Sequence, residues 1–173
     1  MILYYIVFGQ SDFSGVWVSV IGFSIMFAFS LVDQNLLLVH ISELDRLTEL
    51  PNEHGFMHEI NLKFPKYTWH EYDAVYFDVV HMTTYNRKYG NAVGDEILKE
   101  YARTLCEKID DDEVLGCIAG NRFIAFIQRE HTKDFLDILG GIKIRVIDKA
   151  NSEKIELNIK SVAGVYEIPN SNI

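Results

Sequence analysis

Hydrophobic residues follow two contrasting patterns along this chain. Between Asp12 and Asp33 lies FSGVWVSVIGFSIMFAFSLV, an uncharged run of about 20 residues without a polar face. A helix of that length can cross a membrane, and the run lacks the basic region and cleavage site of a secretory signal. We therefore predict a membrane segment over 1–32 with a transmembrane helix over about 13–32. A buried helix of a globular domain is the alternative.

Beyond this run the apolar positions become periodic. VDQNLLLVHISELDRLTEL spaces its apolar residues in a roughly helical way, which predicts a helical stalk or linker over 33–50. Pro51-Asn52 ends it, and a short helix is expected over 53–62. The clearest amphipathic helix is predicted over 94–109, and a further helix over about 132–150.

Four segments read as strands because they are rich in β-branched and aromatic residues. They are YDAVYFDVV, VLGCIA, RFIAFIQ and KIELNIKSVAGVYEIP. Gly120-Asn121 separates the second from the third and predicts a two-residue hairpin loop with positive φ. The element order β-α-α-β-β-α-β predicts an α/β fold, or α+β sandwich, in which helices cover a sheet.

Composition and charge restrict the classes of function. Apolar residues make up 49% of the chain, which is enough for a packed core, and the net charge of −9 argues against a nucleic-acid partner. All 16 basic residues follow residue 44. Cys106 and Cys117 match no metal-binding spacing, and we interpret them as reduced core thiols of a cytosolic domain.

Three motifs resemble those of one enzyme family. DRLTELPNEHGF resembles an opening motif D-x-L-T-x-L-x-N, and FDVVHMTTYNRKYGNAVGDEIL resembles D-x-D-x-F-K-x-x-N-D-x-x-G-H-x-x-G-D-x-x-L. CIAGNRF then falls where R-x-G-G-[DE]-E-F is expected. The chain thus resembles the GGDEF domains of bacterial diguanylate cyclases from Asp45 to about Pro169. We assign 45–173 to such a domain, incomplete at its C-terminus because the family's closing helix and strand do not follow.

This resemblance implies a fold and a chemistry. The fold is palm-like, with helices flanking a central antiparallel sheet. Two domains form a homodimer, and each holds one GTP for joining into cyclic di-GMP. Two metal ions such as Mg²⁺, held by carboxylates, activate the attacking hydroxyl and neutralise the triphosphate.

Several binding residues of the family are retained. By resemblance, Asp78 is a metal ligand, and Asn86 and Asp95 contact the edge of guanine. Two simpler interpretations stay open. Asp95 could be an acid in the first turn of a helix, where the helix dipole favours it, and Asn86 could be a turn residue.

The catalytic groups are lost. The signature reads Ala119, Gly120, Asn121, Arg122, Phe123, so we expect no catalytic residue and only weak binding of Mg²⁺. A positive charge at Arg122 about 4 Å from a unit cation costs roughly 4 kcal/mol, which corresponds to about a thousandfold in rate. Arg122 could instead pair with a nucleotide phosphate, or be a solvated turn residue.

Two further sites are expected to be absent. The family's product-inhibition motif R-x-x-D has Asp110 and Glu113 at its two positions, and an acidic run cannot bind phosphates. His54 and His58 lie four residues apart on a short predicted helix and could share a metal ion, but we expect no nearby carboxylate or cysteine to complete the site. We interpret both histidines as surface residues.

Together these features predict a catalytically degenerate GGDEF domain. We expect it at the bacterial inner membrane, with the domain in the cytoplasm, as a regulatory, dimerising or GTP-sensing module of cyclic di-GMP signalling. Its output would be an EAL domain or another partner protein. Two alternatives remain open: an active diguanylate cyclase with an atypical signature, and an interaction domain that binds no nucleotide.

Overall fold

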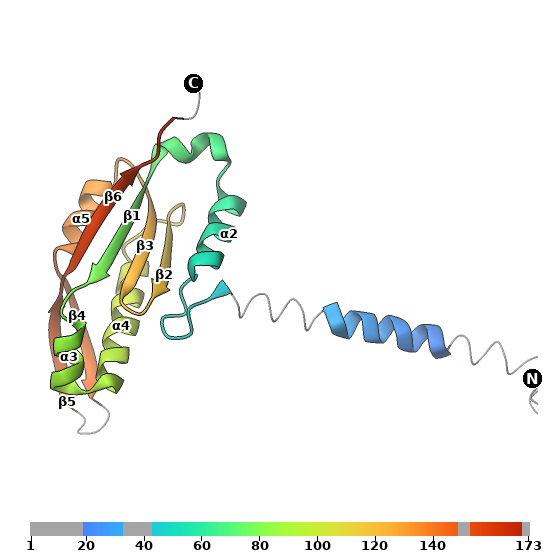
Figure 1. Cartoon of the computed structure of the whole chain (residues 1–173), viewed down its shortest axis with the longest axis horizontal. Helices are drawn as coiled ribbons and strands as arrows, with labels where there is room; N and C mark the ends of the chain where they lie inside the picture. Colours follow the sequence, from blue (N-terminus) through green and yellow to red (C-terminus); the bar gives the residue numbers. More distant parts are fainter. Residues whose placement is uncertain (1–18, 33–42, 149–152, 171–173) are drawn as a thin grey trace, which may run out of the picture. The chain divides into compact units, whose positions relative to one another are not determined.

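The structure, a computed structural model, describes residues 19–32, 43–148 and 153–170. The chain divides into two compact units, Met1–Ser42 and Glu43–Ile173. In the first unit, the described part is a single helix over 19–32. The second unit holds the sheet and all the other helices (Figure 1).

Residues 19–32, the described part of the predicted membrane span, are helical. Among the residues that the structure describes, no helix is both long enough and apolar enough to cross a membrane. The remainder of the predicted segment, 1–18, lies outside the described residues. This finding corrects the predicted inner-membrane location, and the predicted transmembrane helix is not found among the described residues.

In the described part of the predicted stalk, Glu43 is helical and residues 44–50 are not. Residues 33–42 lie outside the described part of the chain, and 46–48 form a turn. Asp45 closes this turn because its Oδ2 accepts hydrogen bonds from the backbone N–H of Thr48, at 2.8 Å, and from the Thr48 hydroxyl, at 2.9 Å. Leu44 then pairs with Pro51 in an isolated antiparallel bridge. Over 44–50, side-chain bonds to the backbone thus hold a turn in place of a helix.

A four-stranded antiparallel sheet forms the centre of the second unit, in the order β2-β3-β1-β6. Figure 1 shows α4 and α5 behind this sheet and α2 beside β2. The predicted α+β architecture is confirmed. The elements are α2 (Glu53–Lys63), the 3₁₀ helix η1 (Lys66–Glu71), β1 (Tyr72–Val79), α3 (Met82–Tyr89), α4 (Asn91–Cys106), β2 (Val114–Ala119), β3 (Arg122–Gln128), α5 (Thr132–Leu139), β4 (Ile142–Asp148), β5 (Glu153–Ile159) and β6 (Ser161–Glu167).

Alternation along β1 determines how the sheet is covered. Val75, Phe77 and Val79 are buried in the main core, which also contains the apolar faces of α4 and α5. The ring of Phe77 stacks on that of Phe123 from β3, with centroids 5.6 Å apart. The intervening residues, including Tyr76 and Asp78, therefore lie on the opposite face of the sheet. At its β2 side, this second face is covered by α2.

The region after α5 differs from the prediction of one long helix. α5 ends at Leu139, before Gly140-Gly141, and β4 follows directly. Alternate residues of β4 are buried, which is the period of a strand rather than of a helix. β4 pairs with β5 in a separate two-stranded sheet, so the single strand predicted near the C-terminus is two strands, β5 and β6.

Candidate functional site

Asp78 stands at the end of β1 on the face of the sheet opposite α4. Its Oδ1 is buried and has no hydrogen-bond partner in the described part of the chain. In the strand register Asp78 lies directly opposite Arg122 of β3 on one side and Val162 of β6 on the other. Directly opposed residues point to the same face, so the predicted metal ligand and the predicted phosphate-binding arginine are neighbours.

The tip of the β2–β3 hairpin is fastened to the end of β1. Asn121 Nδ2 donates a 2.8 Å hydrogen bond to the carbonyl of Val79, and the Asn121 carbonyl accepts one from Val79 N–H at 3.0 Å. Only Gly120 of the loop has a positive φ, 59°, and the strands shift register between Cys117 and Ala119. Gly120 thus supplies the positive φ that was predicted for this loop, and Asn121 fastens the loop to β1.

The loop between β1 and α3 is held by a residue distant in the sequence. Val80 N–H donates to the carbonyl of Lys160, at 3.0 Å, and His81 adopts the left-handed conformation with φ 64°. Lys160 is exposed beside this loop. Sequence analysis missed it because no local pattern relates it to Val80. Left-handed non-glycine residues recur at binding sites, where surrounding contacts hold the strain.

Asn86 and Gly94 meet where α3 packs on α4. Asn86 Oδ1 is buried and, like Asp78 Oδ1, has no hydrogen-bond partner among the described residues. A Cβ on Gly94 would overlap this oxygen, so glycine is required for the close approach. Asn86 lies within α3. The interpretation of Asn86 as a turn residue is therefore excluded.

Asp95 follows Gly94 directly and is exposed on α4. Because α4 begins at Asn91, the carboxylate lies beyond the first helical turn. The helix dipole acts mainly on the first turn, so it gives little reason for an acid at this position.

Asp78 has the chemistry of a Mg²⁺ ligand. Mg²⁺ is commonly bound through one or two carboxylates together with phosphate oxygens of a substrate. Asp78 offers an unpartnered buried oxygen for this purpose. Asn121 offers only a neutral amide, whose nitrogen already donates to Val79, and the positive charge of Arg122 opposite Asp78 disfavours any cation there.

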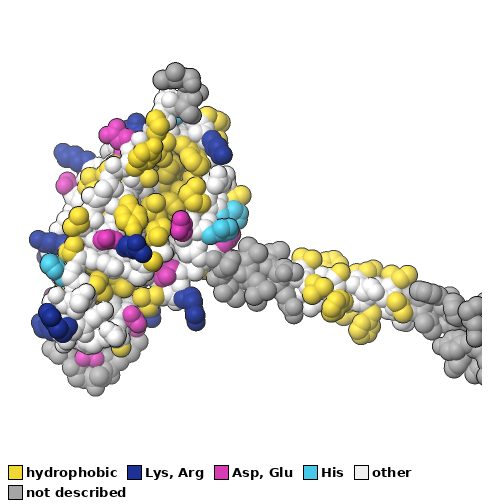
Figure 2. All heavy atoms as spheres, viewed as in Figure 1, with side chains coloured by type: hydrophobic (Ala, Val, Ile, Leu, Met, Phe, Trp, Pro, Cys, Tyr) yellow, Lys and Arg dark blue, Asp and Glu magenta, His cyan; other side chains and the backbone are white. Residues whose placement is uncertain are grey.

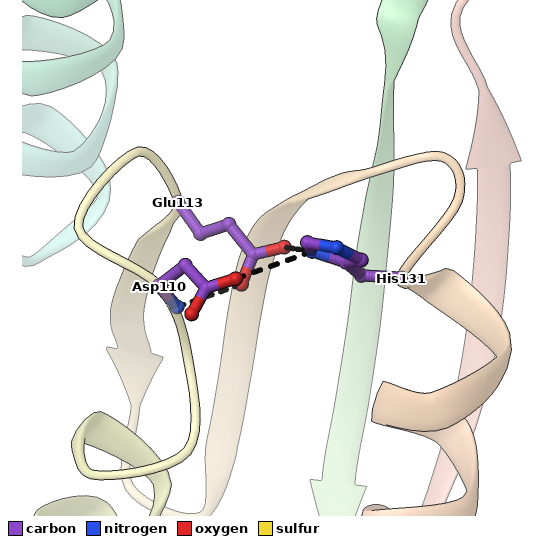
Figure 3. Close-up of side chains that lie close together, drawn as sticks. All are labelled: Asp110, Glu113 and His131. Carbon is purple, nitrogen blue, oxygen red and sulfur yellow. Dashed lines mark hydrogen bonds and ion pairs between the residues drawn. The ribbon is translucent and has the colours of Figure 1, made fainter.

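A second cluster of charged side chains lies at the positions of the product-inhibition motif. Asp110, Glu113 and His131 place ligand-type atoms within 4.8 Å of one another (Figure 3). His131 Nδ1 lies 3.2 Å from Glu113 Oε1 and 3.5 Å from Asp110 Oδ2. Glu113 is buried, and its oxygens also accept from the backbone N–H groups of Asp110 and Gln128. The cluster has no arginine with which to bind a phosphate.

We expect this cluster to make stability depend on pH. The hydrogen bond to Glu113 raises the pKa of His131, and the negative charges of Glu113, Asp110 and Glu130 act in the same direction. The ion pair therefore stabilises the fold fully below the unfolded-state pKa of about 6.5, and this stabilisation is lost as pH rises through the folded-state pKa. Thermal unfolding of the wild type and of His131→Gln should differ more at about pH 6 than at about pH 8.5. A difference independent of pH would contradict this prediction.

Hydrophobic side chains gather on the uncovered part of the sheet. Figure 2 shows them over the face that carries β6 and β1. Tyr76, Val162 and Tyr166 are exposed large residues in these strands, and Val162 lies opposite Asp78. An apolar surface thus borders the predicted metal ligand.

Comparison with known proteins gives a consistent result. Residues 42–172 match the sequence profile of the family described as "Diguanylate cyclase, GGDEF domain". The chain is 24% identical over 137 residues to the probable diguanylate cyclase DgcT of Escherichia coli strain K12. This similarity covers 75% of the chain and 26% of DgcT, so the chain spans about a quarter of that relative.

Solved structures of two diguanylate cyclases share the fold. The coiled-coil and GGDEF domain of DgcB from Caulobacter crescentus, in complex with c-di-GMP, aligns with a TM-score of 0.72 at 16% identity, covering 90% of this chain and 85% of that one. SiaD from Pseudomonas aeruginosa, in complex with its activator SiaC, aligns with a TM-score of 0.60 at 20% identity, covering 94% and 64%.

Proposed function

The chain belongs to the GGDEF domain family of diguanylate cyclases, and we propose that it binds GTP without converting it to cyclic di-GMP. One observation carries this proposal. Asp78 Oδ1 and Asn86 Oδ1 are buried and have no hydrogen-bond partner in the described part of the chain, and both residues match nucleotide-site positions of the family. A buried unpaired acceptor costs about 1–3 kcal/mol, and such a group in a native structure calls for a functional explanation.

Asn86 is proposed to contact the guanine base. Its amide oxygen accepts a hydrogen bond from an N–H group of the ring edge, and the carboxylate of Asp95 accepts from the neighbouring donors. Gly94 contributes by leaving the space that the amide occupies. Together these groups would distinguish guanine from adenine, which lacks the donors at the corresponding positions.

Asp78 and Arg122 are proposed to bind the phosphates. Asp78 would hold one Mg²⁺, the ion that GGDEF domains generally use, and the ion when bound neutralises charge on the triphosphate. Arg122, which lies opposite Asp78 on the neighbouring strand β3, would pair with a phosphate oxygen through its guanidinium. The exposed Lys160 beside the β1–α3 loop would add positive charge.

The same residues argue against turnover. Activation of the attacking hydroxyl requires a second metal ion or a base, and the hairpin supplies Asn121 and Arg122 in place of acids. We therefore propose a regulatory role, exerted through a homodimer, an output domain such as EAL, or a separate partner protein. The complex of SiaD with its activator SiaC supports a role of protein partners in this family.

Calorimetric titration with GTP, with and without Mg²⁺, tests this function. We expect micromolar binding that Mg²⁺ strengthens, and no cyclic di-GMP when the products are separated by chromatography. Formation of cyclic di-GMP would indicate an active cyclase. Absence of binding at millimolar GTP would indicate an interaction domain without a nucleotide.

Gly94→Ala should weaken GTP binding about tenfold, because the new Cβ displaces the amide of Asn86 and removes one hydrogen bond to guanine. Gly164→Ala is the matched control, since a Cβ there meets no atom within 4 Å. Asn86→Ala should reproduce the loss without any clash. Wild-type affinity in Asn86→Ala would contradict the assignment of Asn86 to guanine.

A further inference from the structure

His54 and His58 lie one helical turn apart on α2, and both approach the same carboxylate. His58 Nδ1 is 3.0 Å from Glu43 Oε1, and His54 Nδ1 is 3.7 Å from the same oxygen. Figure 2 shows histidine side chains at the surface of α2. The sequence-based expectation that no carboxylate accompanies these histidines is therefore wrong, because Glu43 reaches them from the segment before the helix.

The backbone of Glu43 is held firmly against the start of α2. Its carbonyl accepts a 2.8 Å hydrogen bond from Asn52 N–H, and Gly55 packs so closely on it that a Cβ would overlap the carbonyl oxygen. Asn52 also caps α2 through Oδ1, which accepts from the N–H groups of His54 and Gly55 at 3.0 Å. The carboxylate and the two imidazoles are thus presented by one rigid local structure.

The carboxylate side chain is largely buried, whereas the two histidine side chains are exposed. The Glu43 side chain is only 16% exposed, whereas those of His54 and His58 are 76% and 49% exposed. The carboxylate is therefore fixed, while both imidazoles have room to rotate. The only described partners of this carboxylate are the two histidine rings. The two imidazoles can therefore rotate until their nitrogens reach bonding distance of an ion held by the fixed carboxylate.

We propose that Glu43, His54 and His58 form a site for a divalent transition metal of the zinc class. Histidines at i and i+4 have Cβ atoms about 5–6 Å apart, which suits two bonds to one ion. Two imidazole nitrogens and one carboxylate oxygen are ligands that Zn²⁺ prefers, with a fourth position open to water. Mg²⁺ and Ca²⁺ prefer oxygen-only sites, so this site is distinct from that of Asp78.

The metal would join two parts of the domain. Glu43 belongs to the segment that enters the domain, and the histidines belong to α2, whose opposite face packs in the core through Phe56 and Ile60. A bound ion therefore cross-links the segment 43–52 to α2. Because an ion that binds only the folded state stabilises it, the thermal midpoint should rise with metal concentration.

The rival metal site is the cluster of Asp110, Glu113 and His131, the one group of three such residues in the described part of the chain whose ligand-type atoms all lie within 4.8 Å of one another. Glu113 there is already engaged through both oxygens by main-chain N–H groups, in addition to His131. Binding a metal would require these bonds to be rearranged. That cluster therefore serves as an internal control for the proposed site.

The test is titration of the full 173-residue chain with Zn²⁺ by calorimetry and with Co²⁺ by visible absorption, in the absence of GTP. We expect one ion bound at the proposed site, with the absorption of a four-coordinate Co²⁺–imidazole complex. His54→Ala, His58→Ala and Glu43→Gln should each weaken binding by about 10- to 100-fold or more. His70→Ala and His131→Ala should bind as the wild type does. Circular dichroism confirms that each variant is folded.

Two results would overturn the proposal. One is wild-type affinity in the double variant His54→Ala/His58→Ala. The other is loss of binding in His131→Ala alone, which would assign the ion to the rival cluster. Because no nucleotide is present, these outcomes are independent of whether the chain binds GTP.

Discussion

Asp78→Ala is expected to stabilise the free protein by about 1 kcal/mol and to weaken GTP binding in Mg²⁺ about a hundredfold. The gain in stability and the loss of GTP affinity have the same cause. The buried Asp78 Oδ1 has no partner in the described part of the free protein, so its removal relieves a desolvation cost. With nucleotide present, the same oxygen is the proposed Mg²⁺ ligand, and the ion's charge-assisted contacts are lost with it.

The two effects are measured separately. Chemical unfolding without ligand gives the change in stability, and calorimetry with GTP and Mg²⁺ gives the change in affinity. Asp111→Ala is the matched control, because it removes the same charge from an exposed position. Equal GTP affinity in Asp78→Ala and the wild type would show that Asp78 holds no metal. A strongly destabilised variant would show that its carboxylate is a structural group.

Arg129→Ala is expected to lower the free energy of unfolding by about 3 kcal/mol. Arg129 Nε lies 3.0 Å from Asp73 Oδ1, and the side chain of Asp73 is only 5% exposed. Thr132 donates to the other carboxylate oxygen at 2.9 Å, and Arg129 also donates to the carbonyl of Ile168. Without the guanidinium, a buried charge at the start of β1 keeps a single neutral donor, which is the reason for the large cost.

Thermal and denaturant unfolding of Arg129→Ala measure this loss. In thermal unfolding, a loss of 3 kcal/mol in the free energy of unfolding lowers the midpoint by on the order of 10 °C. Arg145→Ala is the control, since its ion pair with Glu156 has side chains that are 81% and 70% exposed. Such surface pairs contribute about 0–1 kcal/mol, so this variant should unfold nearly as the wild type does. Equal losses in both variants would contradict the special role of the Asp73 pair.

Local patterns predicted most of the fold. The alternation of YDAVYFDVV, the apolar face of α4 and the Gly120-Asn121 loop each arise within a few residues, and each element was found close to its predicted position. The error at β4 has a local cause as well. Its alternating residues directly follow a helix, and the length of the combined segment favoured one long helix over a helix and a strand.

The candidate site depended on contacts between distant residues. The sequence indicated Asp78, Asn86 and Asp95 by motif, but strand register alone put Arg122 opposite Asp78 and Lys160 beside the β1–α3 loop. A one-residue change of register would turn each side chain to the other face, and no local pattern specifies that register.

By itself, the sequence thus determined the family, the order of most elements and the loss of acids from the hairpin, because these are properties of residue identity and spacing. Only the tertiary structure decided which polar atoms are buried without partners, and that Glu43 joins His54 and His58. Among the described residues it contains no helix that is both long enough and apolar enough to cross a membrane. Burial and convergence depend on how the whole chain packs, so they follow from the fold and not from neighbours in the sequence.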